Sequence, residues 1–202
     1  SIKVKDINGW LKDESGNFIL DKDGKKQLSG EADGVIDDAD KTIIRSSVPD
    51  LSFGLGNTFR YKNFDLSLFF YGEIGRQLNN ETRRDFLSAD RFRFSDNVTT
   101  DSFGRWSSAN PNGKYPSGLY NKYETSTDFW IEKADFIRLK NITLGYTLPA
   151  KMFRGVFKHA RLYFDAQNLF VITNYSGSDP ETDGYTAYPN QRTYSFGVEL
   201  SF

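Results

Sequence analysis

A strict alternation of apolar and polar residues constrains this chain most. Residues 194–202 read YSFGVELSF, and on an extended strand successive side chains point to opposite sides. The apolar side carries Tyr194, Phe196, Val198, Leu200 and Phe202. Chain ends usually fray, so an alternation that continues to the last residue indicates that both faces have fixed surroundings. Lipid on one side and water on the other are such surroundings.

The same pattern occurs in four earlier segments, within residues 51–61, 64–70, 137–148 and 161–170. Together with the last segment they predict five strands and an all-β fold class. The two-residue link Lys62-Asn63 predicts a tight hairpin between the first two. In the third segment, the apolar residues occupy odd-numbered positions up to Leu139 and even-numbered positions from Ile142. This change predicts a β-bulge near Lys140 and Asn141.

The connections between these segments alternate between short and long. The short ones are 62–63 and 149–158, and the long ones are the stretch before residue 51, about 75–135 and about 173–190. Transmembrane β-barrels have short periplasmic turns and long outer loops. We therefore divide the chain into an extracellular acidic loop with an inserted hairpin, residues 1–50, and barrel strands with long extracellular loops, residues 51–202. A soluble antiparallel sandwich with one solvated face is the alternative.

Composition narrows the function classes. The 202 residues include 26 basic and 27 acidic side chains, so no net charge favours nucleic acid. No run approaches the roughly 18 apolar residues of a membrane helix, and the mean hydropathy is -0.58. Barrel strands, however, give a far weaker hydropathy signal than helices. The chain has no cysteine, which excludes disulfides and thiolate metal sites.

The sequence carries no recognisable catalytic motif. His159 is the single histidine, in a short connection where a solvated histidine is the ordinary expectation. G-x-S-x-G, H-E-x-x-H and P-loop patterns are missing from the sequence. We therefore expect neither an enzyme nor an organic cofactor.

Aromatic residues are frequent in the long segment 76–134, among Asn, Ser, Gly and Arg. The candidates for contact with a substrate or a partner protein are Trp106, Tyr115, Tyr120, Tyr123 and Trp130. Such rings can stack on sugar rings or dock a partner. Alternatively, they hold a large loop against its neighbours or mark a membrane interface.

Acidic residues cluster near the start of the chain in two pieces, KDING and ADGVIDDAD. Without residues 10–32 the pieces read D-x-N-G-D-G-x-I-D-x-x-D, which resembles an EF-hand Ca²⁺ loop. The metal-ligand candidates are Asp6, Asn8, Asp33, Val35 through its carbonyl, Asp37 and Asp40. The intervening residues predict a small hairpin turning at Asp23-Gly24. A solvated acidic turn is the alternative.

Five segments, in this order, together resemble one protein family. They are DGVIDDADKTII, PDLSFGLGNTFRYKNFDLSLFFYG, FIRLKNITLGYTLP, LYFDAQNLFVITNYSGSDPE and YPNQRTYSFGVELSF. From about Val4 to Phe202 the chain resembles the C-terminal part of SusC/RagA-type TonB-dependent outer-membrane transporters of Bacteroidetes. The resemblance implies the last five antiparallel strands of a transmembrane barrel of about 22 strands with a plugged lumen. Five strands cannot close, so the remaining barrel would lie on another chain or in a longer protein of which this is a fragment.

The resemblance also implies a function and a location. The expected function is active import of a nutrient across the bacterial outer membrane, commonly an oligosaccharide and sometimes a peptide, powered through TonB. TonB would act on an N-terminal region that these residues do not contain. The other expected partners are a SusD-like surface lipoprotein as a lid, the remaining barrel and plug, and outer-membrane lipid.

Two residue-level roles follow from the same resemblance. The closing ELSF resembles a C-terminal barrel-assembly signal, which includes Phe202. The family's acidic loop carries over to Asp6, Asn8, Asp33, Asp37 and Asp40, split here by an insertion, with Ca²⁺ as the expected ion. A passive porin and a soluble Ca²⁺-dependent carbohydrate-binding β-sandwich remain the alternatives from other classes.

Overall fold

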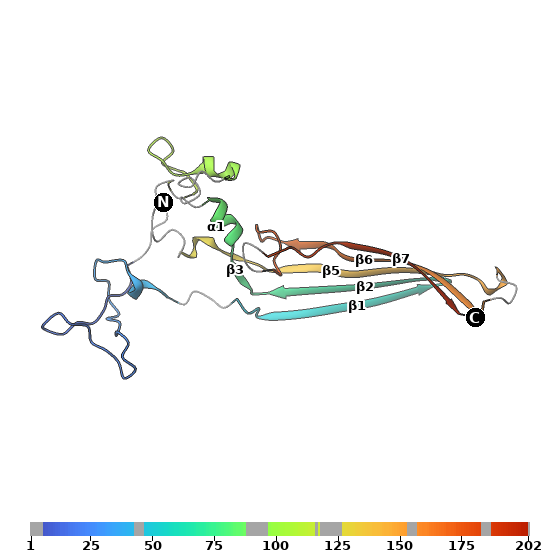
Figure 1. Cartoon of the computed structure of the whole chain (residues 1–202), viewed down its shortest axis with the longest axis horizontal. Coiled ribbons are helices and arrows are strands. Elements are labelled where there is room, and N and C mark those ends of the chain that lie inside the picture. The colour runs from blue at the N-terminus through green and yellow to red at the C-terminus, as the bar shows by residue number, and fades with distance from the viewer. Residues whose placement is uncertain are drawn as a thin grey trace. The chain divides into compact units, whose positions relative to one another are not determined.

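The computed structural model describes residues 6–42, 47–87, 97–115, 117, 127–152, 157–182 and 187–201. The chain forms two compact units, Ser1–Arg45 with Phe86–Phe129, and Ser46–Asp85 with Trp130–Phe202. The second unit contains a five-stranded antiparallel sheet and the first contains the acidic loop and its insertion (Figure 1). Within the described residues no helix is both long and apolar enough to cross a membrane.

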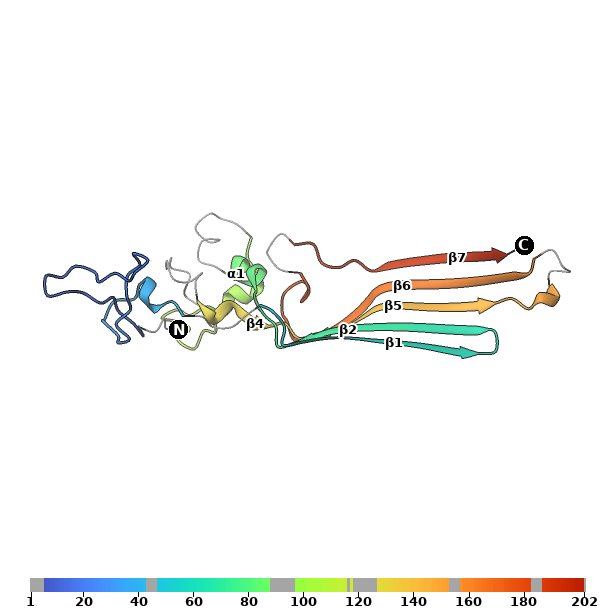
Figure 2. The same cartoon turned by 90° about the horizontal axis from the view of Figure 1, so that it is seen from below.

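The sheet has the strand order β1-β2-β5-β6-β7, and every neighbouring pair is antiparallel. Its strands are β1 (Leu51–Tyr61), β2 (Phe64–Ile74), β5 (Phe136–Thr147), β6 (His159–Thr173) and β7 (Thr193–Ser201). The five strands expected from the alternation are confirmed, as is the hairpin at Lys62-Asn63, where Lys62 takes a positive φ of 53°. The β1–β2 turn and the end of β7 lie at the same end of the sheet (Figure 2).

The register places nearly all apolar residues of the sheet on one face. Cross-strand partners share a face, and the row Phe59, Leu66, Leu144, Phe164, Phe196 crosses all five strands. These side chains are not covered: Phe59 is 58% exposed and Phe196 is 77% exposed. The sheet thus has a continuous apolar face, over which the described residues place no protein layer, and a polar face on its other side.

The predicted bulge lies at Lys140. Against β2, the pairing shifts between Leu139 and Asn141, which leaves Lys140 as the extra residue. Against β6, two residues, Asn168 and Leu169, lie opposite Lys140. Lys140 and Asn141 consequently both reach partners of the polar face, Glu181 and Asp165. The bulge lets the apolar parity change within β5 while the apolar face stays continuous.

Two aromatic residues, Phe69 and Tyr71, occupy polar-face positions in β2 and interrupt the alternation. Phe69 has room because the neighbouring strand offers glycine: a Cβ on Gly54 would lie 3.3 Å from its ring. Tyr71 packs on Phe136 with ring centroids 5.9 Å apart, and its hydroxyl donates to Glu73 at 2.6 Å. Small residues on β1 and a hydrogen-bond partner on β2 therefore allow both rings on this face.

A small core at one end of the sheet involves β3 (Gln77–Asn79), β4 (Ile131–Lys133) and helix α1 (Glu81–Leu87). Trp130, Ala134 and Asn80 are fully buried there. Asn80 starts the helix, since its side-chain oxygen accepts a hydrogen bond from the N–H of Arg83 at 2.9 Å. Single-turn helices are η1 (Asp38–Asp40), η2 (Thr100–Gly104), η4 (Asp128–Trp130) and η5 (Ala150–Met152).

The insertion in the first unit forms three short segments that pair with one another. Leu11 donates to the carbonyl of Gln27, Gln27 to that of Ile19, and Ile19 to that of Leu11. The turns between them follow one pattern, in which Asp13 and Asp21 accept N–H bonds two and four residues ahead. Their glycines, Gly16 and Gly24, take positive φ angles of 86° and 77°. The hairpin expected at Asp23-Gly24 is the second of these turns.

Candidate functional site

The polar face of the sheet carries ionic contacts near the end with the short turns. Arg161 on β6 makes a two-point contact with Asp65 on β2, with Nε at 3.0 Å and Nη2 at 2.5 Å from the carboxylate oxygens. Glu199 on β7 lies 3.8 Å from the same guanidinium group. Arg161 on β6 thereby contacts β2, across β5, and also its direct neighbour β7. These contacts fix the distance between the strands at this end of the polar face.

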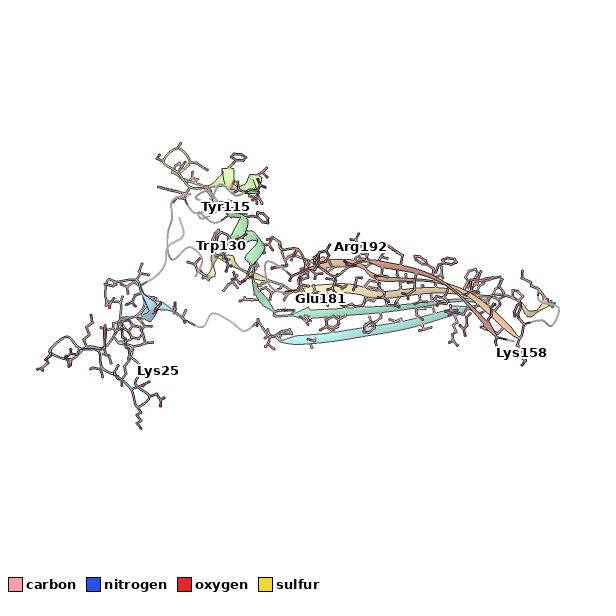
Figure 3. The ribbon with its side chains drawn as sticks, viewed as in Figure 1. Lys25, Tyr115, Trp130, Lys158, Glu181 and Arg192 are labelled. Carbon is pink, nitrogen blue, oxygen red and sulfur yellow. The ribbon has the colours of Figure 1, made fainter. Side chains whose placement is uncertain are left out.

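At the opposite end of the sheet, a loop segment folds onto the polar face. Arg138 on β5 pairs with Asp179 at 2.6 Å and with Glu181 at 2.5 Å, and Lys140 reaches Glu181 at 2.8 Å. The side chains of Arg138 and Asp179 are each 4% exposed. Asn190 adds bonds to both carboxylates. Glu181 and Lys158 mark the two ends of the sheet in Figure 3.

This cluster of Arg138, Lys140, Asp179 and Glu181 ties the β6–β7 connection to the wall of the sheet. Its charges balance, two positive against two negative. Buried charges are retained only when they are paired and hydrogen-bonded. The segment around residue 180 is therefore a fixed part of the polar face rather than a free loop.

A second cluster joins three segments beyond the sheet. Glu132 on β4 accepts bonds from Arg83 at 2.5 Å, from Asn80 at 3.2 Å and from the N–H and hydroxyl of Ser176 at 2.8–3.0 Å. Burial raises the pKa of Glu132, but the hydrogen bonds from Ser176 and Arg83 outweigh it and hold the pKa below its ordinary value. The ionised form of Glu132 thus holds α1, β4 and residue 176 together.

The lowered pKa of Glu132 gives a pH prediction. Because the folded-state pKa lies below the ordinary 4.5, this contribution to stability is present above that pH and is lost as the pH falls through the folded-state value. We expect the protection factors at residues 77–80 and 131–133, that is, exchange corrected for the intrinsic rate at each pH, to fall on acidification below about pH 4.5. Exchange measured by mass spectrometry at pH 6 and pH 4 tests this. Glu132→Gln should remove most of the change, and an unchanged pH response in that variant would contradict it.

The two pieces of the acidic loop meet across the insertion. Asp6 accepts bonds from the N–H groups of Asp33 and Gly34 at 3.2 and 2.7 Å. Asp40 accepts from Ile7 at 2.7 Å, from Asn8 at 3.1 Å and from Asp37 at 2.9 Å. The N–H of Ile7, followed by that of Asp37, lowers the pKa of Asp40. Backbone hydrogen bonds thus close a loop that the sequence interrupts.

The remaining metal-ligand candidates also take part in this loop. Asp33 accepts from the N–H of Val35 at 2.9 Å, and Asp37 accepts from the Trp10 indole at 3.0 Å and from Ala39 at 2.7 Å. Over the part of the chain that the structure describes, no three acidic or histidine side chains are grouped so that they could hold a metal ion. The candidates are therefore brought into one loop, but their carboxylates are directed to N–H groups.

Comparisons with known proteins decide the family. The TonB-dependent receptor P3 of Formosa agariphila is 31% identical over 217 residues, covering 94% of this chain and 21% of that receptor. The TonB-dependent receptor SusC of Bacteroides thetaiotaomicron is 33% identical over 203 residues, covering 94% of this chain and 18% of that receptor. The RagAB peptide importer in its closed-closed state matches with a TM-score of 0.71 and 27% identity over 97% of this chain and 22% of that chain. Over nearly its whole length the chain is similar to these TonB-dependent receptors.

The expected resemblance to the C-terminal part of SusC/RagA-type receptors is thereby confirmed, although no family model matches the chain. The chain spans about a fifth of the length of these relatives. TonB-dependent receptors are outer-membrane β-barrel proteins, and these relatives are receptors and transporters rather than enzymes, as expected from the missing catalytic motifs. In this family the five strands are part of a barrel wall, with the apolar face toward lipid and the polar face toward the lumen.

The aromatic candidates of this receptor chain lie in different surroundings. Trp130 is completely buried and Tyr115 is 7% exposed. The Tyr115 hydroxyl donates to Asp101 at 3.0 Å, and its ring meets Phe129 edge-on. These two rings are thus packed against other residues of the chain, whereas Trp106 is 38% exposed. Tyr120, Tyr123 and Phe202 lie outside the described residues.

Two features of the receptor chain were missed by the sequence reasoning. Asp179 and Glu181 were counted as part of a long loop, although they pair with β5. Glu132 and Asn80 carried no motif that pointed to their shared contact. The sequence did contain one signal for the contacts of Asp179 and Glu181. Arg138 and Lys140 fall on polar positions of the predicted strand, and cations that lie against a sheet require partners of opposite charge.

Excising the insertion tests whether the acidic loop is a unit of its own. Gly9 and Asp33 are adjacent, since Asp33 side-chain atoms occupy the place of a Cβ on Gly9. Joining Gly9 directly to Asp33 in the intact receptor should therefore leave the bonds of Asp6 and Asp40 in place. We expect wild-type resistance of the loop to limited proteolysis. Asp40→Ala is the matched control, and it should make the loop cleavable because three N–H groups lose their acceptor. Cleavage of the excised variant as fast as that of Asp40→Ala would contradict the prediction.

Proposed function

We propose that the whole receptor containing this chain actively imports a nutrient across the outer membrane, and that the nutrient is an oligosaccharide. The observation that carries this proposal is the two-faced sheet, apolar and uncovered on one side and lined with fixed polar groups on the other. Such a sheet suits a wall between lipid and a wet lumen. Similarity to TonB-dependent receptors supports energy coupling as the driving force.

A peptide is the second candidate substrate. It is favoured by the likeness to the RagAB peptide importer, which has a TM-score of 0.71. The exposed Trp106 suits either substrate, because an aromatic ring can stack on a sugar or pack against a peptide side chain.

Several partners belong to the proposal. A SusD-like surface lipoprotein would close the outer loops as a lid, and TonB would act on a region outside these residues. The other partners are the remaining barrel strands, the plug and outer-membrane lipid. Among the described residues no strand pairs with the outer edges of β1 and β7, and this supports the barrel proposal, since in lipid each edge requires a further strand as a hydrogen-bond partner.

Uptake by intact cells tests the proposal. The receptor gene is deleted and restored, and depletion of neutral oligosaccharides and of short peptides from the medium is measured by mass spectrometry. In the restored strain we expect depletion of the neutral oligosaccharides and not of the peptides, and we expect this depletion to be lost when the receptor or TonB is removed. Depletion of the peptides alone would favour the second candidate. Depletion that persists without TonB would favour the passive porin. Recovery of the native protein in the soluble fraction would favour the carbohydrate-binding sandwich.

We also propose that the acidic loop binds Ca²⁺, with Asp6, Asn8, Asp33, Asp37, Asp40 and the Val35 carbonyl as ligands. The closure of Asp6 onto Gly34 across the insertion supports an EF-hand-like loop. Ligation would require the carboxylates to turn from N–H groups to the ion.

The test of the calcium site uses the indole of Trp10, which donates to Asp37 at 3.0 Å. Tb³⁺ bound in place of Ca²⁺ should emit when this indole is excited, and Ca²⁺ should displace it. Trp10→Phe should abolish the sensitised emission, and chelation should increase protease cleavage of the loop. Equal cleavage with and without Ca²⁺, together with no emission that depends on Trp10, would overturn the site.

A further inference from the structure

The two short connections of the sheet, residues 62–63 and 149–158, carry charge of one sign. Their charged residues are Lys62, Lys151, Arg154 and Lys158. Neither connection contains Asp or Glu, whereas the whole chain is balanced, with 26 basic and 27 acidic residues. We call these two connections the basic rim. An excess of positive charge at one end of a balanced chain favours a partner of negative charge.

The two parts of the basic rim adjoin one another. Figure 2 shows the β1–β2 turn, the single-turn helix η5 and the end of β7 at one end of the sheet. The N–H of Thr147 donates to the carbonyl of Asn63, and the N–H of Lys158 to that of Ser201, both at 2.8 Å. The connection from β5 to β6 lies between β2 and β7 of this chain, so further barrel strands would not flank it.

The lysines of the basic rim are not neutralised by the chain itself. Among the residues that the structure describes, no carboxylate lies within ion-pair distance of Lys62, Lys151 or Lys158. The carboxylates of the adjoining strand ends, Asp65 and Glu199, lie on the polar face near Arg161. A plug in the lumen would meet that polar face, on the side opposite to lipid.

The row of the apolar face next to the basic rim is aromatic on its first three strands. Its cross-strand partners are Tyr61, Phe64, Tyr146, Leu162 and Val198. Tyrosine is enriched where hydrocarbon meets headgroups, because its ring is apolar and its hydroxyl polar. Lys62 Nζ lies 5.3 Å from the centroid of the Tyr61 ring, which places this ammonium group beside the apolar face.

The height of the apolar face agrees with a boundary at this row. At about 3.3 Å per residue, β1 advances about 33 Å from Leu51 to Tyr61. With the strand tilt of about 40° in transmembrane barrels, this is about 25 Å along the membrane normal, the height of their apolar band. Short turns of such barrels are periplasmic. The basic rim therefore lies at the level of the headgroups of the periplasmic leaflet.

We propose that the basic rim binds anionic phospholipids of the periplasmic leaflet, with Lys62, Lys151 and Lys158 as the cations. The headgroup phosphate meets the ammonium groups while the acyl chains pack on Tyr61 and the apolar face below it. Met152, which is 64% exposed beside Lys151, adds an apolar side chain at the same level. This inference rests on the barrel wall of the proposed function and names the class of lipid that the wall contacts.

Native mass spectrometry of the intact receptor in detergent tests the proposal. The probes are dioleoyl phosphatidylglycerol, the zwitterionic dioleoyl phosphatidylcholine with the same acyl chains, lipopolysaccharide and inorganic phosphate. The triple variant carries Lys62→Gln, Lys151→Gln and Lys158→Gln. The matched control replaces three exposed lysines of the other unit by Gln, namely Lys22, Lys25 and Lys114. The heat-modifiable folded form of each variant is checked first on gels.

Wild type should bind phosphatidylglycerol at least about tenfold more tightly than phosphatidylcholine. Lys62→Gln alone should weaken phosphatidylglycerol binding about fivefold, and Lys62→Arg should retain it. The triple variant should reduce the preference to within about threefold, and the matched control should keep it. The preference should also fall as the salt concentration rises.

The same preference in the triple variant and in the matched control would overturn the site. Tighter binding of lipopolysaccharide than of phosphatidylglycerol would overturn the assignment to the periplasmic leaflet, and displacement of the lipid by millimolar phosphate would show a site for free anions instead. Uptake by cells is a separate readout. Absent uptake with an intact lipid preference would overturn import alone, and uptake without any lipid preference would overturn only this inference.

Discussion

Phe196→Asp is expected to prevent assembly of the receptor into the outer membrane. Phe196 lies in the middle of β7 on the apolar face, 77% exposed, with the ring of Phe164 6.5 Å away. In lipid this exposure is burial in hydrocarbon, so the substitution removes the favourable transfer of a phenyl ring and places a charge there. The two effects together cost about 4 kcal/mol.

The measurement is the fraction of receptor that migrates as the heat-modifiable folded form in isolated outer membranes. Phe196→Leu keeps the apolar character and should retain most of this fraction. Thr193→Asp introduces the same charge on the same strand but on the polar face, opposite Gln167, and should assemble normally. Equal assembly of Phe196→Asp and Thr193→Asp would contradict the assignment of the apolar face to lipid.

The strands could be predicted because their signal is local. Alternation along β1 or β7 depends only on neighbouring residues, and so does the parity change that revealed the bulge at Lys140. The short elements β3, β4 and α1 give little signal of this kind, since three to seven residues do not establish a period. They are defined by burial of Trp130 and by the contacts of Asn80, which only the fold brings together.

The exception at Phe69 shows the same limit within a strand. Position 69 falls on the polar side of the alternation in β2, so a polar residue was expected there. Nothing in β2 itself explains an aromatic ring at that position. The explanation lies on β1, where Gly54 and Gly56 leave space for it. The register that aligns the two strands is set by the hairpin turn and the pattern together, so the pairing was predictable in principle. Whether the ring would be covered depends on the long loops, whose course the sequence did not indicate.

The acidic loop illustrates the reverse case. The splicing of KDING to ADGVIDDAD was inferred from the sequence, and the structure brings Asp6 to Gly34 across the insertion. The direction of the carboxylates could not be inferred, because an Asp in such a loop can serve either an N–H group or an ion. Sequence spacing determines which residues meet, and the local backbone determines what their side chains bind.

Arg138→Met is expected to release the β6–β7 connection from the wall. Arg138 pairs with Asp179 at 2.6 Å and with Glu181 at 2.5 Å, in surroundings where its side chain is 4% exposed. Without the guanidinium group, Glu181 keeps Lys140, whereas the partners that Asp179 keeps among the described residues are the N–H groups of Glu181 and Asn190. A buried carboxylate without its cation destabilises the arrangement by about 3–5 kcal/mol, so the segment should leave the wall rather than remain there.

Amide exchange and limited proteolysis of residues 174–192 in the intact receptor measure this release. We expect exchange at Glu181 and Asn190 to become at least about a hundredfold faster, which follows from a loss of about 3 kcal/mol. Adding Asp179→Asn to Arg138→Met should restore much of the protection, because Glu181 keeps Lys140 and no carboxylate of the cluster is then left without a cation. Arg161→Met is the matched control at a pair whose arginine side chain is 22% exposed, and it should leave residues 174–192 unchanged. Full protection in Arg138→Met would mean that backbone contacts hold the connection, and that the ion cluster does not position it.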